Sequence, residues 1–535
     1  MDRHDQRSPD ALARRTFLKG ALAAGPLLFI SPSLLTPAKA RAQNIGPSTT
    51  KDAYLLPSIP GVETFSILTV GDSVGGYRMV GIPDGLGAFK SGHGEFTLLM
   101  NHEISANPAG IVRAHGSKGA FVSRWTIDRE TLEVTKGEDL TPSANSVFLW
   151  DGSTSQYTRG TTQWQRLCSA DLPAKDALFA KGRGTKDRIF MDGEEVQEGR
   201  AWARIVTGPH AGEAWQLPRL GHMSFENVVA SPYPQDKTVI VLTDDSNLNT
   251  AGVAANFPSE VYVYIGTKTK NGHPIEQAGL TNGSLYGLTV SVDGHPVTEE
   301  SNAFGLGTTA FVGSGRFGLH DLGDVSNLSA LQLEQASIGA GVLRVQRCED
   351  GAWDPREKHA NDFYFVTTAS LTNNCRLWRL RFDAVEHAEQ GGTIQILLKG
   401  DEGHSMLDNV TIDRWGRILM DEDPGNAPRV SKIWLYSIGT GQLIEVAAHN
   451  PRFFDPTIKN PDFITQDEES SGIIDASHIL ERGWFLVDVQ AHKLSSDPEL
   501  VEGGQLLALF VDPRIGQRKD DEEDDDSGRG GEGRR

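Results

Sequence analysis

Cysteine is scarce in this sequence, which contains 3 among 535 residues. So few thiols cannot build the disulfide framework of a small secreted domain. One bridge, between Cys348 and Cys375, would leave Cys168 as a free thiol. An odd cysteine in an exported protein marks Cys168 as a residue to watch.

Positive charge and nucleotide-binding motifs are also lacking. The formal net charge of −20 argues against a nucleic-acid partner, because such binding needs clustered cations. No CxxC pair, Walker loop or dinucleotide glycine fingerprint occurs, so an NAD or ATP enzyme is poorly supported. The remaining composition, with 58 glycines and 23% charged residues, is that of a globular protein.

The N-terminus has the features of an export signal. Residues 14–19 (Arg-Arg-Thr-Phe-Leu-Lys) form a twin-arginine signature, an apolar run covers 21–35, and small residues up to Ala42 offer a cleavage site. The run is too short, and too broken by Pro and Gly, to remain as a membrane anchor. We therefore expect 1–42 to be a twin-arginine signal peptide read by the export machinery. The mature protein is then periplasmic or secreted, without stable membrane insertion.

Short runs rich in Val, Ile, Tyr, Phe and Trp, separated by Gly, Asn and Asp, predict β-strands almost throughout. Only 328–338 and 382–387 have a weak helical pattern. Six times an apolar strand, usually ending in acids, Asn or His, precedes a strand with aromatic residues; these pairs begin at residues 96, 188, 238, 363, 417 and 484. The repetition predicts an all-β fold, a β-propeller of about six blades with long loop insertions such as 266–340.

This propeller is expected to span residues 43–515 as one catalytic domain. Residues 516–535 follow as an acidic tail, with seven consecutive acids from Asp520 to Asp526. A block of like charges repels itself and is normally disordered.

The acids at the strand ends suggest a metal site. If corresponding strands line one channel, their carboxylates meet at one rim and need cations to neutralise them. Oxygen ligands in such numbers suit Ca²⁺ best, with Mg²⁺, Mn²⁺ or Fe as alternatives. For a single cluster, capping of a turn is the simpler explanation. Recurrence in five strand pairs favours metal.

Three further segments bear on the chemistry. Gly71 to Gly75 fits the G-x-S-x-G pattern of serine hydrolases, but strand and turn residues follow instead of the required helix.

Glu226 enters an apolar strand pair, where an unpaired carboxylate would be costly. Either a salt bridge to Arg204 or Arg219, or a metal ion, would balance its charge. The segment 403–423 is similar, because Asp408 enters a strand and Asp421 closes it.

At these residues the sequence resembles the PhoX family of exported alkaline phosphatases. The matching features occur in order along the chain: the twin-arginine leader, Cys168 before Glu194-Glu195, 221–226 before 243–245, 347–350 before 353–355, and Asp408-Asn409 before 416–417. The sequence departs from the family where 168–171 read Cys-Ser-Ala-Asp instead of Cys-Ala-Gly-Gly, and where Phe225 replaces the His of a His-Glu pair.

The resemblance implies a six-bladed propeller with iron and calcium at the mouth of its channel. Cys168 and Glu194-Glu195 would be the first iron and calcium ligands, and Glu226 and Asp408 the next. Together with the strand-end acids, the predicted metal ligands are Glu103, Cys168, Glu194, Glu195, Glu226, Asp244, Asp408 and Asp421.

The same resemblance implies the chemistry. The cofactors would be Ca²⁺ and Fe³⁺, and a metal-bound oxygen would attack phosphorus, so that no side-chain nucleophile is required. Arg166, Arg200 and Arg204 are candidates for holding the phosphate in a bidentate manner. The predicted catalytic residues are Cys168, Glu195 and Arg204.

The expected activity is hydrolysis of small-molecule phosphate esters. The departures from the family pattern leave open a hydrolase of phosphodiesters or phosphotriesters on the same scaffold. A non-enzymatic, Ca²⁺-stabilised propeller that binds a surface partner also remains. Removal of metal by a chelator distinguishes these two possibilities. An enzyme loses its catalytic turnover on chelation, whereas a binding scaffold has no turnover before or after it.

Overall fold

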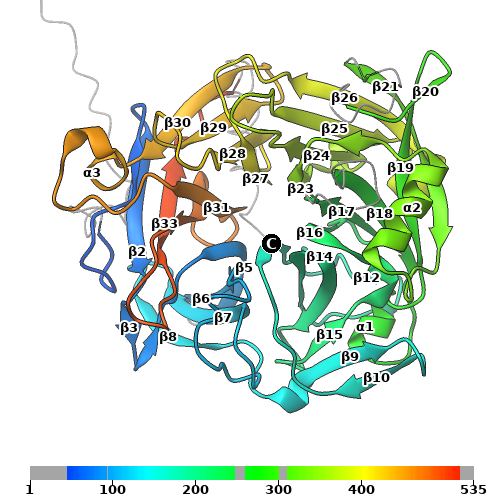
Figure 1. The fold of residues 1–535 in the computed structure, drawn as a ribbon, viewed down its shortest axis with the longest axis horizontal. Helices are drawn as coiled ribbons and strands as arrows, with labels where there is room; N and C mark the ends of the chain where they lie inside the picture. Colours follow the sequence, from blue (N-terminus) through cyan, green and yellow to red (C-terminus); the bar gives the residue numbers. More distant parts are fainter. Residues whose placement is uncertain (1–44, 93, 247–258, 301–309, 312, 518–535) are drawn as a thin grey trace, which may run out of the picture.

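The computed structural model describes residues 45–517 apart from 93, 247–258, 301–309 and 312. The expected signal peptide, and the acidic tail beyond Gln517, lie outside the described residues. Within them the chain is mostly strand, arranged as sheets around a central axis (Figure 1).

Six strands form the innermost layer around this axis: β5 (Pro83–Gly92), β11 (Leu167–Asp171), β16 (His222–Ala230), β23 (Cys348–Trp353), β27 (Leu407–Ile412) and β31 (Glu468–Asp475). Each of these strands contacts the next one, and β31 contacts β5, so that the ring closes. The predicted β-propeller is therefore confirmed, and the ring gives it six blades.

Blades one, five and six are separate antiparallel sheets. Blade one contains β5, β6 (Glu95–His102), β7 (Phe121–Asp128) and β8 (Val134–Asp139). Blade five contains β27, β28 (Arg417–Glu422), β29 (Lys432–Ser437), β30 (Leu443–His449) and β1 (Leu55–Pro57). Blade six contains β31, β32 (Trp484–Ala491), β33 (Gly503–Val511) and β2 (Val62–Thr69).

The ring is closed by strands from both ends of the described chain. β2 pairs with β33 along its whole length, from Val62 opposite Val511 to Thr69 opposite Gln505. β1 pairs in the same antiparallel manner with β30. The N-terminal segment thus completes two blades whose other strands come from the C-terminal part, which joins the ends of the propeller through backbone hydrogen bonds.

Blades two, three and four share edges. Blade two contains β11, β14 (Ile189–Ile205), β15 (Ala214–Gln216), β9 (Val147–Asp151) and β10 (Gln156–Arg159). Blade three contains β16, β17 (Lys237–Asp244), β18 (Ser259–Thr267), β19 (Ser284–Val292), β20 (His295–Val297) and β22 (Arg344–Val345). Blade four contains β23, β24 (Asp362–Thr367), β25 (Arg376–Phe382) and β26 (Gly392–Leu398).

The segment 266–340, expected as a loop insertion, folds largely into strands and a helix. Its strand β21 (Ser314–Gly323) pairs with both β19 and β26, and so joins blade three to blade four. Helix α2 (Ala330–Ala340) follows, near the helix predicted at 328–338. Ser329 caps its first turn in a capping box with Gln332, and Gly341 ends it with a φ of +71°.

Strand β14 turns back on itself. The carbonyl of Arg188 accepts from the N–H of Val206 at 2.8 Å, and Arg200 pairs with Glu194 at 2.6 Å. In both pairs the two residues are equally far from Gln197 along the sequence. The two halves of β14 therefore lie antiparallel around a tight turn at 195–199. The sequence pattern, which predicts separate strands at 188–191 and 201–205, describes these two halves.

The remaining elements are short: α1 (Pro274–Gln277), α3 (Pro451–Phe454), the 3₁₀ helices at Ala144–Ser146, Pro218–Leu220, Glu357–His359, Val385–Gln390 and Pro456–Ile458, and the strands β3 (Ser73–Val74), β4 (Tyr77–Arg78), β12 (Phe179–Ala180) and β13 (Arg183–Gly184). The helix predicted at 382–387 is wrong in its first part, because Phe382 ends β25. In the described part of the chain, no helix combines the length and apolar character needed to span a membrane.

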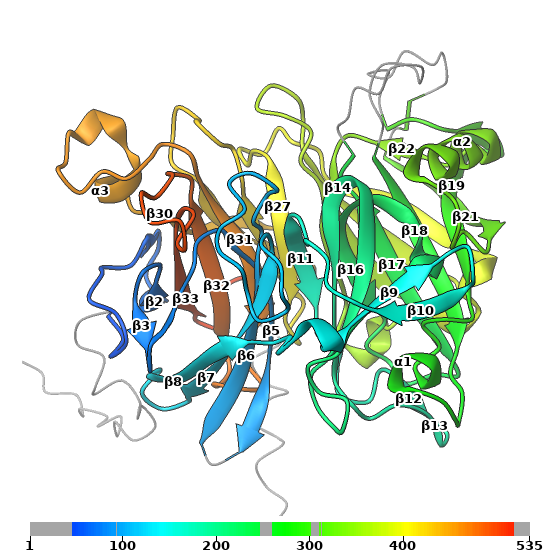
Figure 2. The ribbon, with the colours of Figure 1, turned by 60° about the horizontal axis from the view of Figure 1, so that its bottom comes forward.

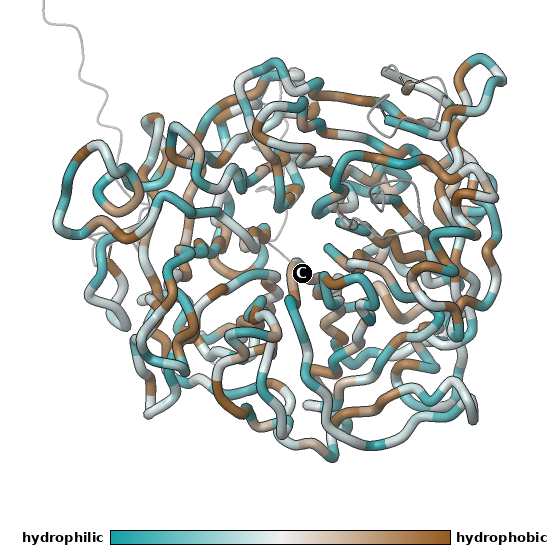
Figure 3. Tube along the Cα trace, in the orientation of Figure 1, coloured by the Kyte–Doolittle hydropathy of each residue, from teal (hydrophilic) through white to brown (hydrophobic). Residues whose placement is uncertain are grey.

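The core lies between neighbouring blades. Strands such as β17 and β24 are buried over nearly their whole length, because each blade packs against a neighbour on both faces. Brown, hydrophobic segments accordingly recur all around the tube in Figure 3. Between blades five and six, for example, Leu419 and Leu435 belong to one buried cluster with Phe485 and Leu507. This packing makes the blades rigid supports for the residues at the axis.

Candidate metal centre

A cavity of about 660 Å³ lies over the first residues of the inner strands, near the axis seen in Figures 1 and 2. Its lining contains eight carboxylates: Glu103, Glu195, Glu226, Glu349, Asp408, Asp423, Asp467 and Glu469. Three basic side chains, Arg166, Arg347 and His492, line it as well. The cavity is therefore strongly acidic, with cationic groups at separate points.

Every inner strand contributes one carboxylate or thiol to this centre. Five of them line the cavity directly: Cys168 from β11, Glu226 from β16, Glu349 from β23, Asp408 from β27 and Glu469 from β31. The sixth, Asp84 from β5, lies against Cys168, with 3.6 Å between Oδ2 and Sγ. The blade repeat thus delivers six potential ligands to one place.

A shift of the strand register marks five of these six positions. The strand register shifts around Asp84, Cys168, Glu226, Glu349 and Asp408, and in β31 between Ser470 and Ile473, just after Glu469. A bulged residue leaves the regular ladder, so its side chain can be aimed away from the alternating pattern. Because the irregularity surrounds the acid or thiol in five of the six inner strands, it is a repeated feature that can turn this side chain toward the axis, whereas Glu469 stays in register with Gln490.

Burial and mutual repulsion oppose ionisation of these acids. Burial, followed by repulsion from neighbouring carboxylates, raises the pKa well above its ordinary value in Asp84, Glu226, Glu349, Asp408 and Asp423. Burial and the charge of Glu103 also raise the pKa of Glu195 to about 8, although Arg166 opposes the shift. Multivalent cations would reverse this tendency by stabilising the charged forms.

The donor atoms are arranged to hold cations. Three overlapping groups have ligand atoms within 4.8 Å of one another: Asp84–Glu103–Cys168, Cys168–Glu195–Glu226 and Glu226–Glu349–Asp408. Oε2 of Glu226 is buried and has no hydrogen-bond partner among the described residues. Carboxylate oxygens suit hard cations, whereas a thiolate suits a softer transition metal. The residues present therefore fit a cluster of more than one cation.

Uncharged polar residues hold the acids from behind. Ser169 donates from Oγ to Glu226 at 2.5 Å and accepts from Asn409 at 2.5 Å, which links blades two, three and five. Gln490 donates from Nε2 to Asp84 and to Glu103, at 3.0 Å each. Such partners fix the orientation of potential ligands, as they do around known metal sites.

The basic residues neutralise part of the acidic lining. Arg166 pairs with Glu195 and, at 2.7 Å, with Glu103, while its side chain stays 41% exposed. Arg347 pairs with Asp245 at 2.7 Å and Glu349 at 3.0 Å. Burial lowers the pKa of His492, but Glu469 and Glu502 outweigh this effect and raise it to about 11. All three groups are thus positively charged near neutral pH.

The structure brings five of the eight predicted ligands to the cavity: Glu103, Cys168, Glu195, Glu226 and Asp408. The salt bridge from Glu226 to Arg204 or Arg219 is absent among the described contacts, because Arg204 pairs with Asp192 and Arg219 with Asp324. Glu226 instead bonds to Ser169.

Glu194 and Arg204 lie away from the cavity. Successive strand residues point to opposite faces, so Glu194 faces away from Glu195 and pairs with Arg200 at 2.6 Å. Arg204 is fully buried, pairs with Asp192 at 2.6 Å and stacks over Trp164. Among the three arginines considered for the phosphate, only Arg166 lines the cavity.

Asp244 and Asp421 lie at the ends of second strands and do not line the cavity either. Asp244 accepts a hydrogen bond from Ser246 at 2.6 Å. Burial, together with the negative charges of Glu334 in α2 and of Asp244, raises the pKa of Glu260 in β18. Asp421 is fully buried, and its carboxylate acts on that of Asp488. These acids belong to the interior of the blades, which is why their position after an apolar strand was misleading.

The prediction also missed residues of the cavity: Arg347, Glu349, Asp423, Glu469 and His492, with Asp84 behind them. The sequence contains a better indicator of these residues than acids at strand ends, namely an acid or thiol near the start of an inner strand. In β5, β11, β23 and β27 the second residue is the acid or thiol. This position is visible in the sequence once the inner strands are known.

Two other expectations have clear outcomes. The disulfide between Cys348 and Cys375 is wrong, because both are free, buried thiols, as Cys168 is. Cys348 belongs to the core cluster of blades three and four, and Cys375 to that of blades four and five. Ser73 lies in the β3–β4 hairpin rather than before a helix, as the weakness of the serine-hydrolase motif predicted.

Fold and site together define a six-bladed β-propeller with an acidic, thiol-containing centre at its axis. No family profile matches the chain, and no curated protein matches it by sequence. Among solved structures, PhoX from Pseudomonas fluorescens in complex with vanadate, a transition-state analogue, is similar with a TM-score of 0.57. It is 12% identical in sequence, and the match covers 89% of this chain and 99% of that chain. The resemblance to PhoX predicted from sequence is thereby confirmed at the level of the fold.

Two other matches are more distant. One is XC5397 from Xanthomonas campestris, a gluconolactonase, with a TM-score of 0.36 and 10% identity, covering 84% of this chain and 90% of that chain. The other is the PQQ-bound aldose sugar dehydrogenase from Streptomyces coelicolor, with a TM-score of 0.37 and 9% identity, covering 85% and 100%. Both TM-scores are too low to support an inference about function.

Proposed function

We propose that this protein is a metal-dependent phosphate-ester hydrolase of the PhoX alkaline phosphatase type. The observation that carries the proposal is the set of six ligand-type side chains, one from each inner strand, at a single cavity. The similar fold of PhoX, whose structure holds the transition-state analogue vanadate, supports the same reaction class.

The donor set supports calcium and iron as cofactors. Cys168 with Glu195 and Glu226 would hold iron, because this group combines a soft thiolate with two carboxylates, and all three residues line the cavity. Glu226, Glu349 and Asp408 would hold Ca²⁺ through oxygen alone. When bound, these cations would supply Lewis-acid activation of the phosphate and of the attacking water.

The protein's own residues would bind and orient the ester. Arg166 and Arg347 place two guanidinium groups at the cavity, and a guanidinium matches two oxygens of a phosphate. In the absence of substrate, both groups pair with lining acids. A phosphate would compete for Arg166 in particular, because this side chain is the more exposed one.

The dimensions of the site favour small substrates. A cavity of about 660 Å³ lies within the usual range for small-molecule sites, roughly 300–1,000 Å³. Its acidic lining disfavours long polyanions such as nucleic acids, which need an extended cationic surface. The substrate class we propose is therefore a small phosphate ester, and the proposed alkaline phosphatase type makes a monoester the expected one.

We also propose export through the twin-arginine route to the periplasm or beyond. The support is the Arg14-Arg15 signature with its apolar run. Twin-arginine signals typically serve proteins that fold before export, and a propeller built around several cations fits that requirement.

The experiment is metal analysis of the purified protein combined with a substrate series. Calcium and iron are measured by mass spectrometry, and 4-nitrophenyl phosphate, bis(4-nitrophenyl) phosphate and a 4-nitrophenyl phosphotriester are assayed before and after chelation. We expect monoester hydrolysis that is lost on chelation and restored by Ca²⁺ with iron. Preferential hydrolysis of the diester or triester would assign the alternative substrate class. Absence of turnover on all three, in metal-loaded protein, would leave the binding scaffold.

A further inference from the structure

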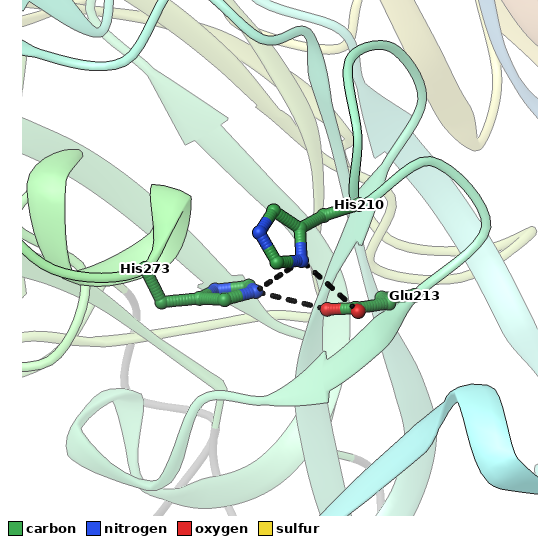
Figure 4. A group of neighbouring side chains, drawn as sticks. All are labelled: His210, Glu213 and His273. Carbon is green, nitrogen blue, oxygen red and sulfur yellow. Dashed lines mark hydrogen bonds and ion pairs between the residues drawn. The ribbon is translucent and has the colours of Figure 1, made fainter.

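A second group of ligand-type residues lies at the outer part of blades two and three, apart from the central cavity. His210 and Glu213 lie in the turn between β14 and β15, and His273 directly precedes helix α1. Figure 4 shows their side chains pointing toward one another, from two segments that are more than 50 residues apart in the sequence. None of the three lines the central cavity.

Their ligand atoms lie close together. Nδ1 of His210 is 3.1 Å from Oε1 of Glu213 and 3.2 Å from Nε2 of His273, and Nε2 of His273 is 2.9 Å from Oε2 of Glu213. A tetrahedral Zn²⁺ ion with bonds of about 2.0–2.1 Å separates its ligands by about 3.3–3.4 Å. Each of these contacts is within about half an ångström of that separation. The two nitrogens face different oxygens of Glu213, so this carboxylate has to turn for one oxygen to complete the ligand set.

The two imidazole rings are poorly explained by hydrogen bonding alone. Only one hydrogen atom can lie between the facing nitrogens of His210 and His273, and full protonation of both rings would place two positive charges against each other. Burial lowers the pKa of His273, which favours the neutral form that binds metals. Its Nδ1 is buried without a hydrogen-bond partner among the described residues.

Neighbouring groups hold the carboxylate and a ring in place. Nε1 of Trp215 donates to Oε2 of Glu213 at 2.9 Å, and the Trp215 ring lies 4.4 Å from that of His273. Trp215 is itself stacked on Phe148, with 3.8 Å between the ring centres. Such outer contacts orient ligands at metal sites. His210, whose side chain is 41% exposed, leaves an approach from solvent.

We propose that His210, Glu213 and His273 form a Zn²⁺ site, with the fourth position open to water. Two imidazoles and one carboxylate are a ligand set typical of zinc. The ion would join the β14–β15 turn to the segment before α1, and so connect blade two to blade three at their outer edge. This site is independent of the central cavity and of the function proposed for it.

The test is zinc titration of the full protein with the central site saturated with Ca²⁺. The variants are His210→Ala and Glu213→Gln, and the control is His320→Ala, an exposed histidine of β21. Wild type and control should bind one more equivalent of Zn²⁺ than His210→Ala, and Glu213→Gln should bind it at least tenfold more weakly. Tryptophan fluorescence should change with this equivalent, because Trp215 contacts two of the ligands.

A loss of zinc in the variants has to come from the outer site itself. Circular dichroism and calcium content, equal to those of wild type, establish that each variant is folded. Zinc bound in the central cavity contributes equally to wild type and to His210→Ala, so it cancels in the difference. Equal zinc stoichiometry and affinity in wild type and both variants would overturn the proposal.

Discussion

Sγ of Cys168 lies 3.6 Å from Oδ2 of Asp84, a contact that joins the inner strands of blades one and two. Both groups are buried, and burial followed by repulsion from neighbouring acids raises the pKa of each well above its ordinary value. Two acidic groups in contact are stable as a charged pair only next to a cation. Without a cation the neutral thiol donates to the carboxylate, whereas a cation would stabilise the charged forms of both groups. The contact therefore supports the proposal that Cys168 is a metal ligand.

The first prediction tests this role. Cys168→Ala should remove iron and lower phosphate-ester turnover by about 100-fold or more, while calcium content and fold remain, because Cys168 supplies the thiol of the cavity lining among the described residues. Metal content and kcat are measured on the same preparations. Cys375→Ala is the matched control, because that thiol is also buried but packs in the core of blades four and five. Full activity and iron in Cys168→Ala would make the thiol structural.

The second prediction concerns the stability of the whole propeller. Exhaustive chelation should lower the melting temperature, because a ligand that binds only the folded state stabilises it by mass action. The effect should be large here, since removing cations leaves buried acidic groups from the inner strands facing one another. Calorimetry before chelation, after chelation and after re-addition of Ca²⁺ measures it. A melting temperature that does not move would contradict a cation cluster at the axis.

Much of the fold could be predicted because it depends on repeated local patterns. The runs at 96–100 and 433–436 are strands of the expected kind, buried and rich in apolar and aromatic residues. The closure of the ring by β1 and β2 could not be predicted, because it pairs residues at least 390 positions apart, such as Leu55 with His449. Nothing local in either segment specifies its partner.

The site was only partly predictable for a related reason. Glu194 and Glu195 are equivalent in sequence, but strand alternation sends one to Arg200 and the other to the cavity. The bulges that aim Glu349 and Asp408 leave no mark in residue type, so the inner strands could not be told from the second strands. Acids at the ends of second strands, such as Asp421, therefore resemble ligands in the sequence although they are buried inside the blades.

The third prediction separates two arginines that were both candidates for binding phosphate. Arg166→Met should lower kcat/KM for the ester by about 10- to 100-fold without unfolding the protein, because a hydrogen bond to a charged group contributes about 1.5–3 kcal/mol. Arg204→Met should instead destabilise the fold by about 3–5 kcal/mol, because it leaves the fully buried Asp192 without its ion pair.

Urea unfolding and steady-state kinetics on both variants give the comparison, and each variant is the control for the other. If Arg204→Met kept full stability but lost activity, Arg204 and not Arg166 would be the phosphate-binding residue.

The fourth prediction concerns stability at acidic pH and depends on two buried histidines. His102 bonds from Nε2 to Ser123 at 2.8 Å, and His449 from Nε2 to Ser470 at 2.7 Å. Burial lowers the pKa of each to about 3, with the charge of Arg113 adding to the effect at His102. Each ring therefore stays neutral in the folded protein at pH values where a histidine of the unfolded chain is protonated.

The direction follows from proton binding. Between about pH 6.5 and pH 3 the unfolded state binds protons that the folded state does not, so the free energy of unfolding falls as the pH falls. Each histidine should lower the free energy of unfolding by about 2 kcal/mol between pH 7 and pH 5, since one pKa unit corresponds to about 1.36 kcal/mol.

His102→Gln and His449→Gln carry no titrating ring, so this share of the pH dependence should disappear in them. Urea unfolding at pH 7 and pH 5, with Ca²⁺ held constant, should show the gap between wild type and each variant narrowing on acidification. A gap that stays constant would mean that the rings are protonated in the folded state, and that their burial does not limit the stability of the propeller in acid.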